Sequence, residues 1–396
     1  PPTALPLQTV FFGGGTPSLL SVPQLSAILD RLHGRFGLVP GAEISMEMDP
    51  GTFALEHLKG YLDAGITRIS LGVQSLDDTL LEACGRFHRV ADVYQAVEWL
   101  HRVGMGNWSL DLISGLPHLT GEAWNRQLKD ALALGPHHVS VYDLTLEPQT
   151  VFGKRYEPGN SPLPTDDDTV AMYRRAQEFF TQQGYNHYEV SNYARPGHEC
   201  RHNLTYWRNQ PYLGFGMGAT SYTSHQRVSR PRTLQAYKAW VADYRATGGR
   251  HPEPTTPRSE QLLDRLMVGL RLKAGISGTD LQGLCDEVTW QRLYRYLFPY
   301  IQQGWVCLDI HEKGAAPQQA FGRPVKENSP GTEKILKSTP PGVAVQVPDD
   351  VAVSSVSPPP LSSLKRLSLS DPDGFLFSNV VLADVFQLCP DLLGDG

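Results

Sequence analysis

The sequence predicts an α/β fold in which parallel strands form a barrel or partial barrel, followed by a smaller helical domain. Short β-rich segments alternate with helical segments from Thr9 to about Val190, which is typical of a parallel sheet with crossover helices. Five such repeats favour a barrel, although a doubly wound open sheet would give a similar pattern. The length of 396 residues suffices for two or three domains.

Strands are expected in short runs rich in β-branched and apolar residues, at 9–12, 43–48, 68–73, 109–114 and 138–144. The segments between them carry apolar residues at helical spacing, for example Leu25, Ile28, Leu29 and Leu32, or Val93, Ala96, Val97 and Leu100. They are predicted to be outer helices that pack one face on the strands. Thr120 is a candidate N-cap, and Gly104 and Gly135 lie near expected helix ends.

Beyond Pro164 we expect a long helix, a strand at 186–190 and then an irregular aromatic region up to Tyr222. From Gln261 the apolar spacing becomes helical again, and a second helix is expected around 294–301. These later helices indicate a small separate domain.

The composition changes between His311 and Ser363, where Pro, Ser, Lys and Gly dominate. Such a segment cannot bury enough apolar area to offset its ordering entropy, so we predict a disordered insertion at 311–363. Order is expected to return at 364–369 and in a helical end, which places the insertion in a hairpin-like loop. The predicted domains are a barrel with an aromatic extension at 1–250 and a C-terminal domain at 251–310 and 364–390.

The charge balance argues against a nucleic-acid partner. The chain has 35 basic and 41 acidic residues and a formal net charge of -6, so no overall field draws phosphates or anionic lipids to it. A short basic run from His225 to Arg232 is expected to be a solvated loop. No apolar run reaches the roughly 18 residues that a membrane span needs, and the start has no signal-peptide pattern.

The cysteines indicate a reducing compartment. The chain has five, none in a C-x-x-C pair: Cys84, Cys200, Cys285, Cys307 and Cys389. An odd number of widely spaced cysteines argues against a secreted disulfide framework, so we expect a cytoplasmic protein. The chain also opens with Pro-Pro-Thr and not with Met, directly before a predicted strand. We expect from this that a preceding segment is missing.

A glycine-rich turn is the sharpest local motif. Gly13-Gly14-Gly15-Thr16-Pro17 comes directly after the first predicted strand. Its glycines allow a ligand to approach the backbone closely and leave N–H and C=O groups available to it. A tight βα turn without a ligand would use the same residues.

Polar side chains lie at or near the ends of the following strands: Glu47, Gln74, Arg86 and Asp111. In a parallel barrel these ends share one face, so the four residues could converge on one ligand. Arg86 can bind a carboxylate through two hydrogen bonds, and Glu47 or Asp111 can accept from an amine or from ribose hydroxyls. The mixture suits a zwitterion with a sugar, and unrelated surface residues are the alternative.

Two further patterns lie near residue 210. Gly214, Gly216 and Ala219 spell G-x-G-x-x-A, but we reject a dinucleotide site because the following residues are a poor helix start. The string from His198 to His202 places ligand-type residues two positions apart, which would face one way on an extended strand. It could bind a metal or a heme iron, with ordinary surface residues as the alternative.

An aromatic string follows, with the pattern His-Asn-x-x-Tyr-Trp at His202, Asn203, Tyr206 and Trp207. Aromatic faces beside a histidine can cover a flat macrocycle while the imidazole binds its iron. A core aromatic cluster is the alternative.

Taken together, GGGTP at 13–17, RISLGVQS at 68–75, the strand of Asp111 and HNLTYW at 202–207 resemble radical S-adenosylmethionine (radical SAM) proteins related to oxygen-independent coproporphyrinogen III oxidase. More narrowly, they are similar to the HemW-type heme chaperones. The resemblance implies a partial (β/α)6 TIM-like barrel, here missing its first strand, and a small winged-helix-like C-terminal domain. The match in that domain includes SDPDGFLFSN at 370–379.

The resemblance also implies site residues and cofactors. S-adenosylmethionine would contact Gly14, Gly15, Thr16, Glu47, Gln74, Arg86 and Asp111. Heme would lie against His202, Asn203, Tyr206 and Trp207, with His202 as the candidate iron ligand and Cys200 or His198 as competitors.

The sequence departs from the family at the iron–sulfur cluster. The family holds a [4Fe-4S] cluster with a C-x-x-x-C-x-x-C loop, and no such triplet occurs here. The resemblance places that loop ahead of Pro1, so we expect the chain as given to lack radical catalysis.

Two functions follow from the resemblance. The first is a heme chaperone that binds heme and hands it to acceptor proteins, among them membrane-associated respiratory enzymes. The alternative is an oxygen-independent coproporphyrinogen III oxidase of porphyrin biosynthesis, which would need the cluster. A third expectation is that the isolated chain has no activity and exposes a sheet edge where its first strand is missing.

Overall fold

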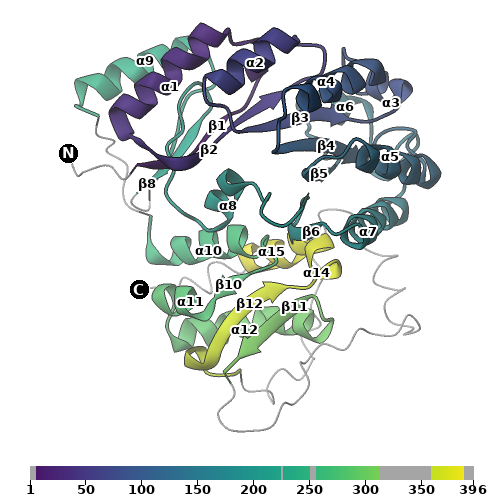
Figure 1. Cartoon of the computed structure of the whole chain (residues 1–396). Coiled ribbons are helices and arrows are strands. Elements are labelled where there is room, and N and C mark those ends of the chain that lie inside the picture. The colour runs from purple at the N-terminus through teal and green to yellow at the C-terminus, as the bar shows by residue number, and fades with distance from the viewer. Residues whose placement is uncertain (1–5, 224–225, 250–255, 312–357, 388–396) are drawn as a thin grey trace. The chain divides into compact units, whose positions relative to one another are not determined.

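The structure is a computed structural model that describes residues 6–223, 226–249, 256–311 and 358–387 (Figure 1). The chain divides into two compact units, one ending at His202 and the other beginning at Asn203. The predicted insertion at 311–363 lies almost entirely outside the described residues. The domain limits expected from the sequence stay a prediction.

The first unit is built on a seven-stranded sheet that forms a half-barrel. Strands β1 to β5 are parallel and neighbours in chain order, and β7 and β6 extend the sheet in antiparallel orientation. The strands are β1 (Leu7–Phe12), β2 (Leu38–Met48), β3 (Arg68–Gln74), β4 (Trp108–Ser114), β5 (His138–Asp143), β6 (Asn186–Glu189) and β7 (Asn192–Ala194). The predicted α/β partial barrel is confirmed, and all the strands expected from the sequence are present.

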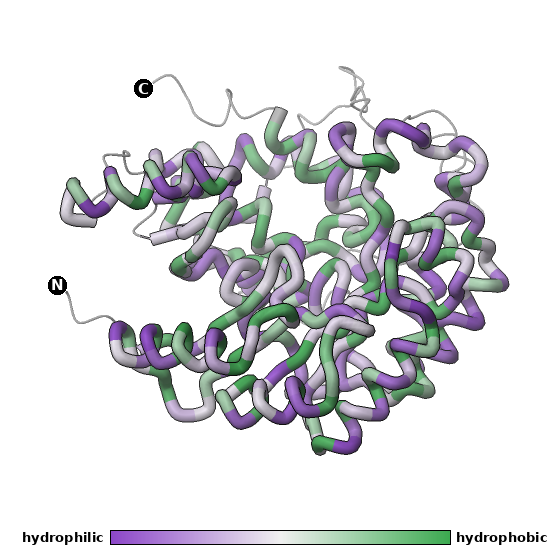
Figure 2. Tube along the Cα trace, turned by 90° about the horizontal axis from the view of Figure 1, so that it is seen from above, coloured by the Kyte–Doolittle hydropathy of each residue, from purple (hydrophilic) through white to green (hydrophobic). Residues whose placement is uncertain are grey.

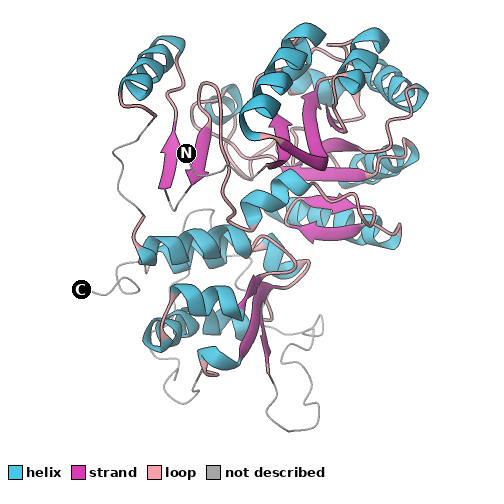
Figure 3. Ribbon diagram, turned by 60° about the vertical axis from the view of Figure 1, so that its left-hand side comes forward, coloured by secondary structure: helices cyan, strands magenta, loops and turns pink. Residues whose placement is uncertain are grey.

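Helices cover the outer face of this sheet (Figure 3). The helices of this unit are η1 (Pro17–Leu19), α1 (Val22–Phe36), α2 (Leu55–Asp63), α3 (Asp78–Ala83), α4 (Val90–Arg102), α5 (Gly121–Ala133), α6 (Val151–Arg155) and α7 (Asp166–Gln182). Ser21 and Gln24 form a capping box at α1, and Thr120 caps α5 as predicted. Gly104 and Gly135 follow α4 and α5 with φ of 69° and 75°, a conformation that favours glycine.

The two faces of the sheet differ in polarity because side chains alternate along each strand. One face carries the apolar core residues that pack under the helices, among them Ile44, Met46, Ile69, Leu71, Leu110, Leu112, Val139 and Val141. The other face carries a row of register partners, Glu47, Ser70, Ser109 and His138. Figure 2 shows hydrophobic and hydrophilic residues interspersed along the trace. The half-barrel therefore has a polar inner face.

The region after residue 190, predicted to be irregular, contains the regular elements β7 and α8 (Arg201–Trp207). The extended arrangement considered for His198, Cys200 and His202 is absent, because a helix begins at Arg201. The backbone N–H groups of Arg201 and His202 donate to the Glu43 carboxylate, at 3.2 and 2.9 Å. An acidic side chain at a helix start satisfies donors that have no partner within the helix, which is why this segment coils.

The second unit combines helices with a three-stranded antiparallel sheet of order β10-β12-β11 and a separate β8-β9 hairpin. Its elements are β8 (Thr220–Thr223), β9 (Gln226–Ser229), α9 (Leu234–Ala246), α10 (Arg258–Gly269), β10 (Ile276–Ser277), α11 (Gly278–Leu284), α12 (Glu287–Gln302), β11 (Val306–Ile310), η3 (Leu361–Ser363), β12 (Leu364–Leu369), α14 (Asp373–Leu376) and α15 (Ser378–Gln387). The segment LKRLSL, where order was expected to return after the insertion, forms the central strand β12 of this sheet. β11 and β12, which flank the predicted insertion, form an antiparallel pair.

Two local predictions in this unit have clear outcomes. The solvated loop expected at 225–232 is wrong for Gln226–Ser229, which form β9, and Arg227 on that strand is ion-paired with Asp264 at 3.1 Å. The G-x-G-x-x-A pattern precedes strand β8, so the expectation that no helix begins directly after it is confirmed. No helix within the described ranges is long and apolar enough to cross a lipid bilayer.

Packing of α1 on the sheet gives a test of the fold. The side chain of Leu25, on α1, is fully buried in the core, whereas that of Leu19, in η1, is 71% exposed. Leu25→Ala is expected to lower the free energy of unfolding by about 2 to 5 kcal/mol, because it leaves a cavity. The matched control Leu19→Ala should change it by less than about 0.5 kcal/mol. Denaturant titration of both variants measures this, and equal effects would contradict the packing described here.

Candidate functional site

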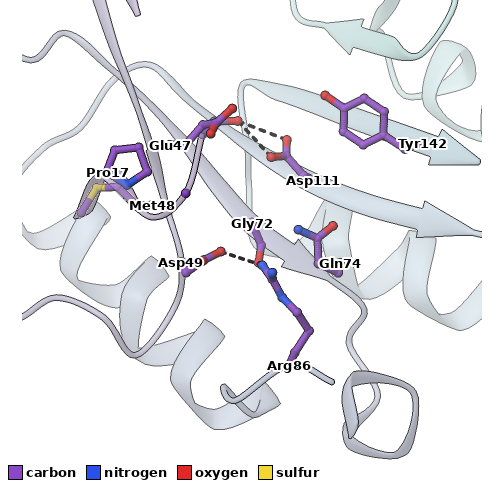
Figure 4. A pocket seen from close by; sticks show the side chains of 11 residues that line it. Pro17, Glu47, Met48, Asp49, Gly72, Gln74, Arg86, Asp111 and Tyr142 are labelled. Atoms are coloured by element: carbon purple, nitrogen blue, oxygen red, sulfur yellow. Dashed lines mark hydrogen bonds and ion pairs between the residues drawn. The ribbon is translucent and has the colours of Figure 1, made fainter. Parts of the chain in front are cut away.

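A polar cavity of about 360 Å³ lies at the carboxyl ends of the parallel strands (Figure 4). Its lining brings together five of the residues predicted from the sequence: Gly15, Glu47, Gln74, Arg86 and Asp111. It also includes residues that sequence reasoning missed: Pro17, Met48, Asp49, Ser70, Gly72 and Tyr142. The volume is within the range of roughly 300 to 1,000 Å³ usual for small-molecule sites.

The glycine turn after β1 forms one wall of the cavity. Gly14 and Gly15 have φ of 77° and 62°, which favours glycine at both positions. A Cβ atom on Gly13 would lie 2.5 Å from the Phe11 ring, so the turn can pass close to β1 only as glycine. Two of the predicted residues of this turn, Gly14 and Thr16, are not among the lining residues.

Glu47 ties the glycine turn to β2. The Gly14 N–H donates to Glu47 Oε2 at 3.0 Å. Burial raises the pKa of Glu47, the Gly14 hydrogen bond partly offsets that rise, and the nearby Asp49 charge adds to it. The carboxylate is thus held in place while its negative charge stays incompletely compensated.

Arg86 is held by a carboxylate of the same chain. Its Nη2 lies 2.6 Å from Asp49 Oδ1, and it also donates to the Gly72 carbonyl at 3.2 Å. A Cβ on Gly72 would lie 2.8 Å from the Asp49 carboxylate, so glycine is needed for this pair to lie against β3. The buried Arg86 Nε has no hydrogen-bond partner among the described residues. A ligand carboxylate could accept from it.

Gln74 ends β3 in a strained conformation. Its φ of 68° is unusual for a residue other than glycine. The register between β3 and β4 shifts between Leu71 and Gln74, and Gln74 lines the cavity. Such strain is a recurrent feature of ligand sites, where the surrounding structure maintains it.

Asp111 lies at the centre of the inner face. Ser70 Oγ donates to its two carboxylate oxygens at 3.2 and 3.1 Å, and Ser70 also pairs with Ser109 at 2.7 Å. Burial raises the pKa of Asp111 to about 6, hydrogen bonds from Ser140 and Ser70 limit the rise, and the Glu47 charge contributes to it.

The charges in the cavity favour a cationic ligand. Three carboxylates, from Glu47, Asp49 and Asp111, face one guanidinium, from Arg86. When all four are ionised, the lining has a formal charge of -2. A ligand that carries two positive charges and one carboxylate would complement this arrangement.

A second group of residues surrounds His202, the last residue of the first unit. Its Nδ1 lies 2.8 Å from Thr9 Oγ1, and its ring stacks on Phe11 with centroids 4.9 Å apart and an interplanar angle of 14°. Burial lowers the pKa of His202 to about 4, so the imidazole is neutral at physiological pH. The α8 backbone at this point is anchored to Glu43.

The rest of the aromatic string belongs to the second unit. The Tyr206 ring packs edge-on against Tyr212 with centroids 4.6 Å apart. Trp207 accepts a hydrogen bond from Arg265 at its carbonyl, and Arg271 lies over its ring at 5.9 Å. Because one turn of helix separates residues four apart, His202 and Tyr206 share one face of α8 while Asn203 and Trp207 share another.

The other ligand-type residues near His202 are differently engaged. His198 packs against the His137 ring at 4.6 Å and its Nδ1 lies 3.3 Å from Asn107 Oδ1. The buried Cys200 thiol donates to Glu43 at 3.7 Å. The three residues are therefore not one ligand set. Within the described ranges, no group of three or more His, Cys, Asp or Glu side chains could hold a metal ion, so these residues do not fit an iron–sulfur cluster.

Asp49 is the most informative of the missed residues. It directly follows β2 in the string Met48-Asp49-Pro50, so the reasoning applied to Glu47 would have included it. Its pairing with Arg86 depends on the approach of the α3–α4 connection to β3, for which the sequence has no local signal.

The chain is similar to proteins of one family. The pattern described as "Radical SAM superfamily" matches residues 3–131. "Heme chaperone HemW" from Synechocystis is 42% identical over 381 residues, covering 96% of this chain and 83% of the relative. "Heme chaperone HemW" from Lactococcus lactis is 37% identical over 271 residues, covering 68% of this chain and 70% of the relative.

A solved structure shares the fold. It is described as coproporphyrinogen III oxidase (HemN) from Escherichia coli, a radical SAM enzyme, and superposes with a TM-score of 0.65 at 23% identity. The match covers 76% of this chain and 72% of that one. At this identity the likeness concerns the fold alone.

The environment of Asp111 predicts a pH dependence of stability. A carboxyl whose pKa is about 6 when folded and 3.8 in the reference state stabilises the fold most below pH 4, and this contribution is lost as the pH rises through 6. The free energy of unfolding of the wild type, minus that of Asp111→Asn, should fall by about 2 kcal/mol between pH 4 and pH 7. Denaturant titrations at several pH values measure the difference, and parallel profiles would contradict the assignment. Because the Glu47 charge acts on Asp111, the difference includes the mutual repulsion of the two carboxylates.

Proposed function

The chain belongs to the HemW family of heme chaperones within the radical SAM superfamily, and we propose on this premise that it binds heme and passes it to acceptor proteins. The observation that carries the proposal for this chain is the protonation and the orientation of the His202 imidazole. Its imidazole is neutral, held by Thr9 and stacked on Phe11. A neutral, oriented imidazole is the form of histidine that binds heme iron.

His202 is favoured over the two competing ligands by their contacts. The Cys200 thiol is buried and donates to a carboxylate, an environment that opposes formation of the thiolate needed for iron binding. The His198 ring packs against His137 and lies beside Asn107. We therefore propose His202 as the iron ligand.

Other residues of α8 are proposed to contact the macrocycle. Tyr206 shares a helix face with His202, so an aromatic ring lies one turn along the helix from the imidazole. Asn203 and Trp207 would contribute a polar and an aromatic contact from the adjacent face. Flat porphyrins suit such aromatic surfaces.

We propose that the strand-end cavity binds S-adenosylmethionine. This molecule carries an ammonium, a sulfonium and a carboxylate, which matches a lining with net negative charge and one arginine. Glu47 and Asp111 would face the cationic groups and the ribose of this molecule. Arg86 would bind its carboxylate, and Gln74 would contact a further polar group. Gly14, Gly15 and Thr16 would offer backbone groups of the glycine turn.

The radical SAM family implies a [4Fe-4S] cluster, with which bound S-adenosylmethionine supplies radical chemistry. The described residues of this chain do not fit that cluster, so the roles proposed for them are binding and orientation. Binding of the cationic cosubstrate would lower the pKa of Asp111 and so keep its carboxylate ionised, because a positive neighbour favours the charged form of a carboxyl.

The coproporphyrinogen oxidase alternative has no specific support in this chain, since the oxidase structure is 23% identical to it and informs on the fold alone. We propose a cytoplasmic location, in keeping with an odd number of widely spaced cysteines in the sequence. The acceptors of the heme are proposed to be apoproteins that bind heme themselves.

Heme titration of His202→Ala tests the main proposal. Loss of the iron ligand is expected to weaken heme binding at least tenfold and to change the Soret absorption of the complex. His33→Ala is the matched control, because His33 is exposed in the last turn of α1, and it should bind heme like the wild type. Unchanged affinity and spectrum in His202→Ala would sink the assignment of the ligand.

Calorimetric titration with S-adenosylmethionine and S-adenosylhomocysteine tests the cavity. The second compound lacks the sulfonium charge, so at pH 7.5 we expect it to bind about tenfold more weakly. The preference should shrink as the pH falls through about 6, where Asp111 takes up a proton, and it should be smaller at pH 7.5 in Asp111→Asn. Equal affinities for both compounds at pH 7.5 would contradict the proposed charge complementarity.

A further inference from the structure

We propose that Gln127, a buried residue of α5 that does not line the strand-end cavity, is a positioning residue for the cosubstrate, because it holds the turn that carries Gln74. This role rests on the proposed binding of S-adenosylmethionine in the cavity. It deepens that proposal by naming a residue behind the site on which the position of one ligand contact depends.

Gln74 lies in a turn that needs support from its surroundings. The Ser75 N–H donates to the Val73 carbonyl at 2.8 Å, and Gln74 between them has a φ of 68°. A hydrogen bond across three residues defines a γ-turn, and the form with a positive φ at the central residue is rare and strained. Glutamine is not among the residues that favour positive φ, so the contacts around the turn must maintain this conformation.

Gln127 binds the chain directly after Gln74. Its Oε1 accepts from Ser75 Oγ at 2.9 Å and from the Leu76 N–H at 3.1 Å. The backbone N–H settles which end of the amide is the acceptor, because an N–H can only donate. Ser75 and Gln127 are both buried, so the Ser75 hydroxyl cannot exchange this acceptor for water without cost.

The chain before Gln74 is held from a different element. His88 Nε2 lies 3.1 Å from the Val73 carbonyl oxygen, and Arg86 Nη2 donates to the Gly72 carbonyl at 3.2 Å. A carbonyl oxygen can only accept, so His88 is the donor in its contact. Both side chains come from the connection between α3 and α4. Support before and after the turn therefore comes from separate parts of the chain.

The turn sets where the Gln74 amide lies in the cavity. A Cβ atom on Gly72 would lie 3.2 Å from both Gln74 Nε2 and Arg86 Nη2, so the two side chains lie over the same part of β3 (Figure 4). Gln74 would thus contact the end of the ligand that Arg86 binds. If the turn shifts, the amide moves away from this end, and affinity falls although every lining side chain is still present.

A double-mutant cycle, read by calorimetric titration with S-adenosylmethionine at pH 7.5, tests the role of Gln127. Gln127→Met keeps the length of the side chain but removes the acceptor, and it should weaken binding about 3- to 10-fold, the effect of one lost hydrogen bond. Gln74→Gly removes the amide, while glycine adopts the positive φ without strain. In that background Gln127→Met should change the affinity less than about twofold, because no amide remains to be displaced.

Two further variants separate positioning from a loss of stability. Gln127→Glu keeps an acceptor oxygen for Ser75 and Leu76 and should restore most of the affinity. Leu25→Ala destabilises the fold from the core, and Leu25 does not line the cavity. Under conditions in which Leu25→Ala is folded, it should bind S-adenosylmethionine like the wild type.

The outcomes distinguish this role from the function on which it rests. If Gln127→Met weakens binding equally in both backgrounds, leaves it unchanged, or acts no more strongly than Leu25→Ala, Gln127 does not position Gln74 and the inference is wrong. If the wild type does not bind S-adenosylmethionine, the proposed function of the cavity is wrong and the inference falls with it.

A second variant decides the question if Gln127→Met does not fold. Ser75→Ala removes one of the two donors to Gln127 and leaves the Leu76 N–H in place. It should weaken binding less than the loss of both contacts, and this effect should disappear in the Gln74→Gly background. An effect of the same size in both backgrounds would overturn the inference.

Discussion

The alternation of side chains along five adjacent parallel strands is the constraint on which the rest of the first unit depends. It divides β1 to β5 into an apolar face, which the helices cover, and a polar inner face. A sheet covered on both faces by helices would need apolar residues on both. Here the inner face can keep Glu47, Ser70 and Asp111. Burial raises the pKa values of Glu47 and Asp111, and both carboxylates accept hydrogen bonds from this chain.

Strand β2 connects the two proposed binding regions. Glu43 anchors the start of α8 and the backbone of His202, and Glu47, four residues later on the same face, contacts the glycine turn. At about 3.3 Å per residue the two carboxylates are roughly 13 Å apart along one strand. A heme ligand and a cosubstrate cavity are thus held by the same rigid element, although each has its own set of contacts.

The sequence predicted the parts that depend on local periodicity and on strand ends. The strands, the Thr120 cap and the convergence of Glu47, Gln74, Arg86 and Asp111 follow from patterns within short segments. The helix at Arg201–Trp207 was missed, because it starts on Glu43, 158 residues earlier in the chain. The contact of Thr9 with His202 spans 193 residues, and the positive φ of Gln74 depends on a register shift between strands. Such features arise from tertiary contacts, which single-sequence patterns do not contain.

Pulsed EPR of the ferric heme complex, prepared with nitrogen-15-labelled histidine, would test the central claim most directly. The claim is that a histidine of this chain carries the heme iron. The account predicts a strong hyperfine coupling from a nitrogen-15 histidine nucleus bound to the iron. A spectrum that shows only porphyrin nitrogens, with no coupling from the labelled histidine, would contradict it.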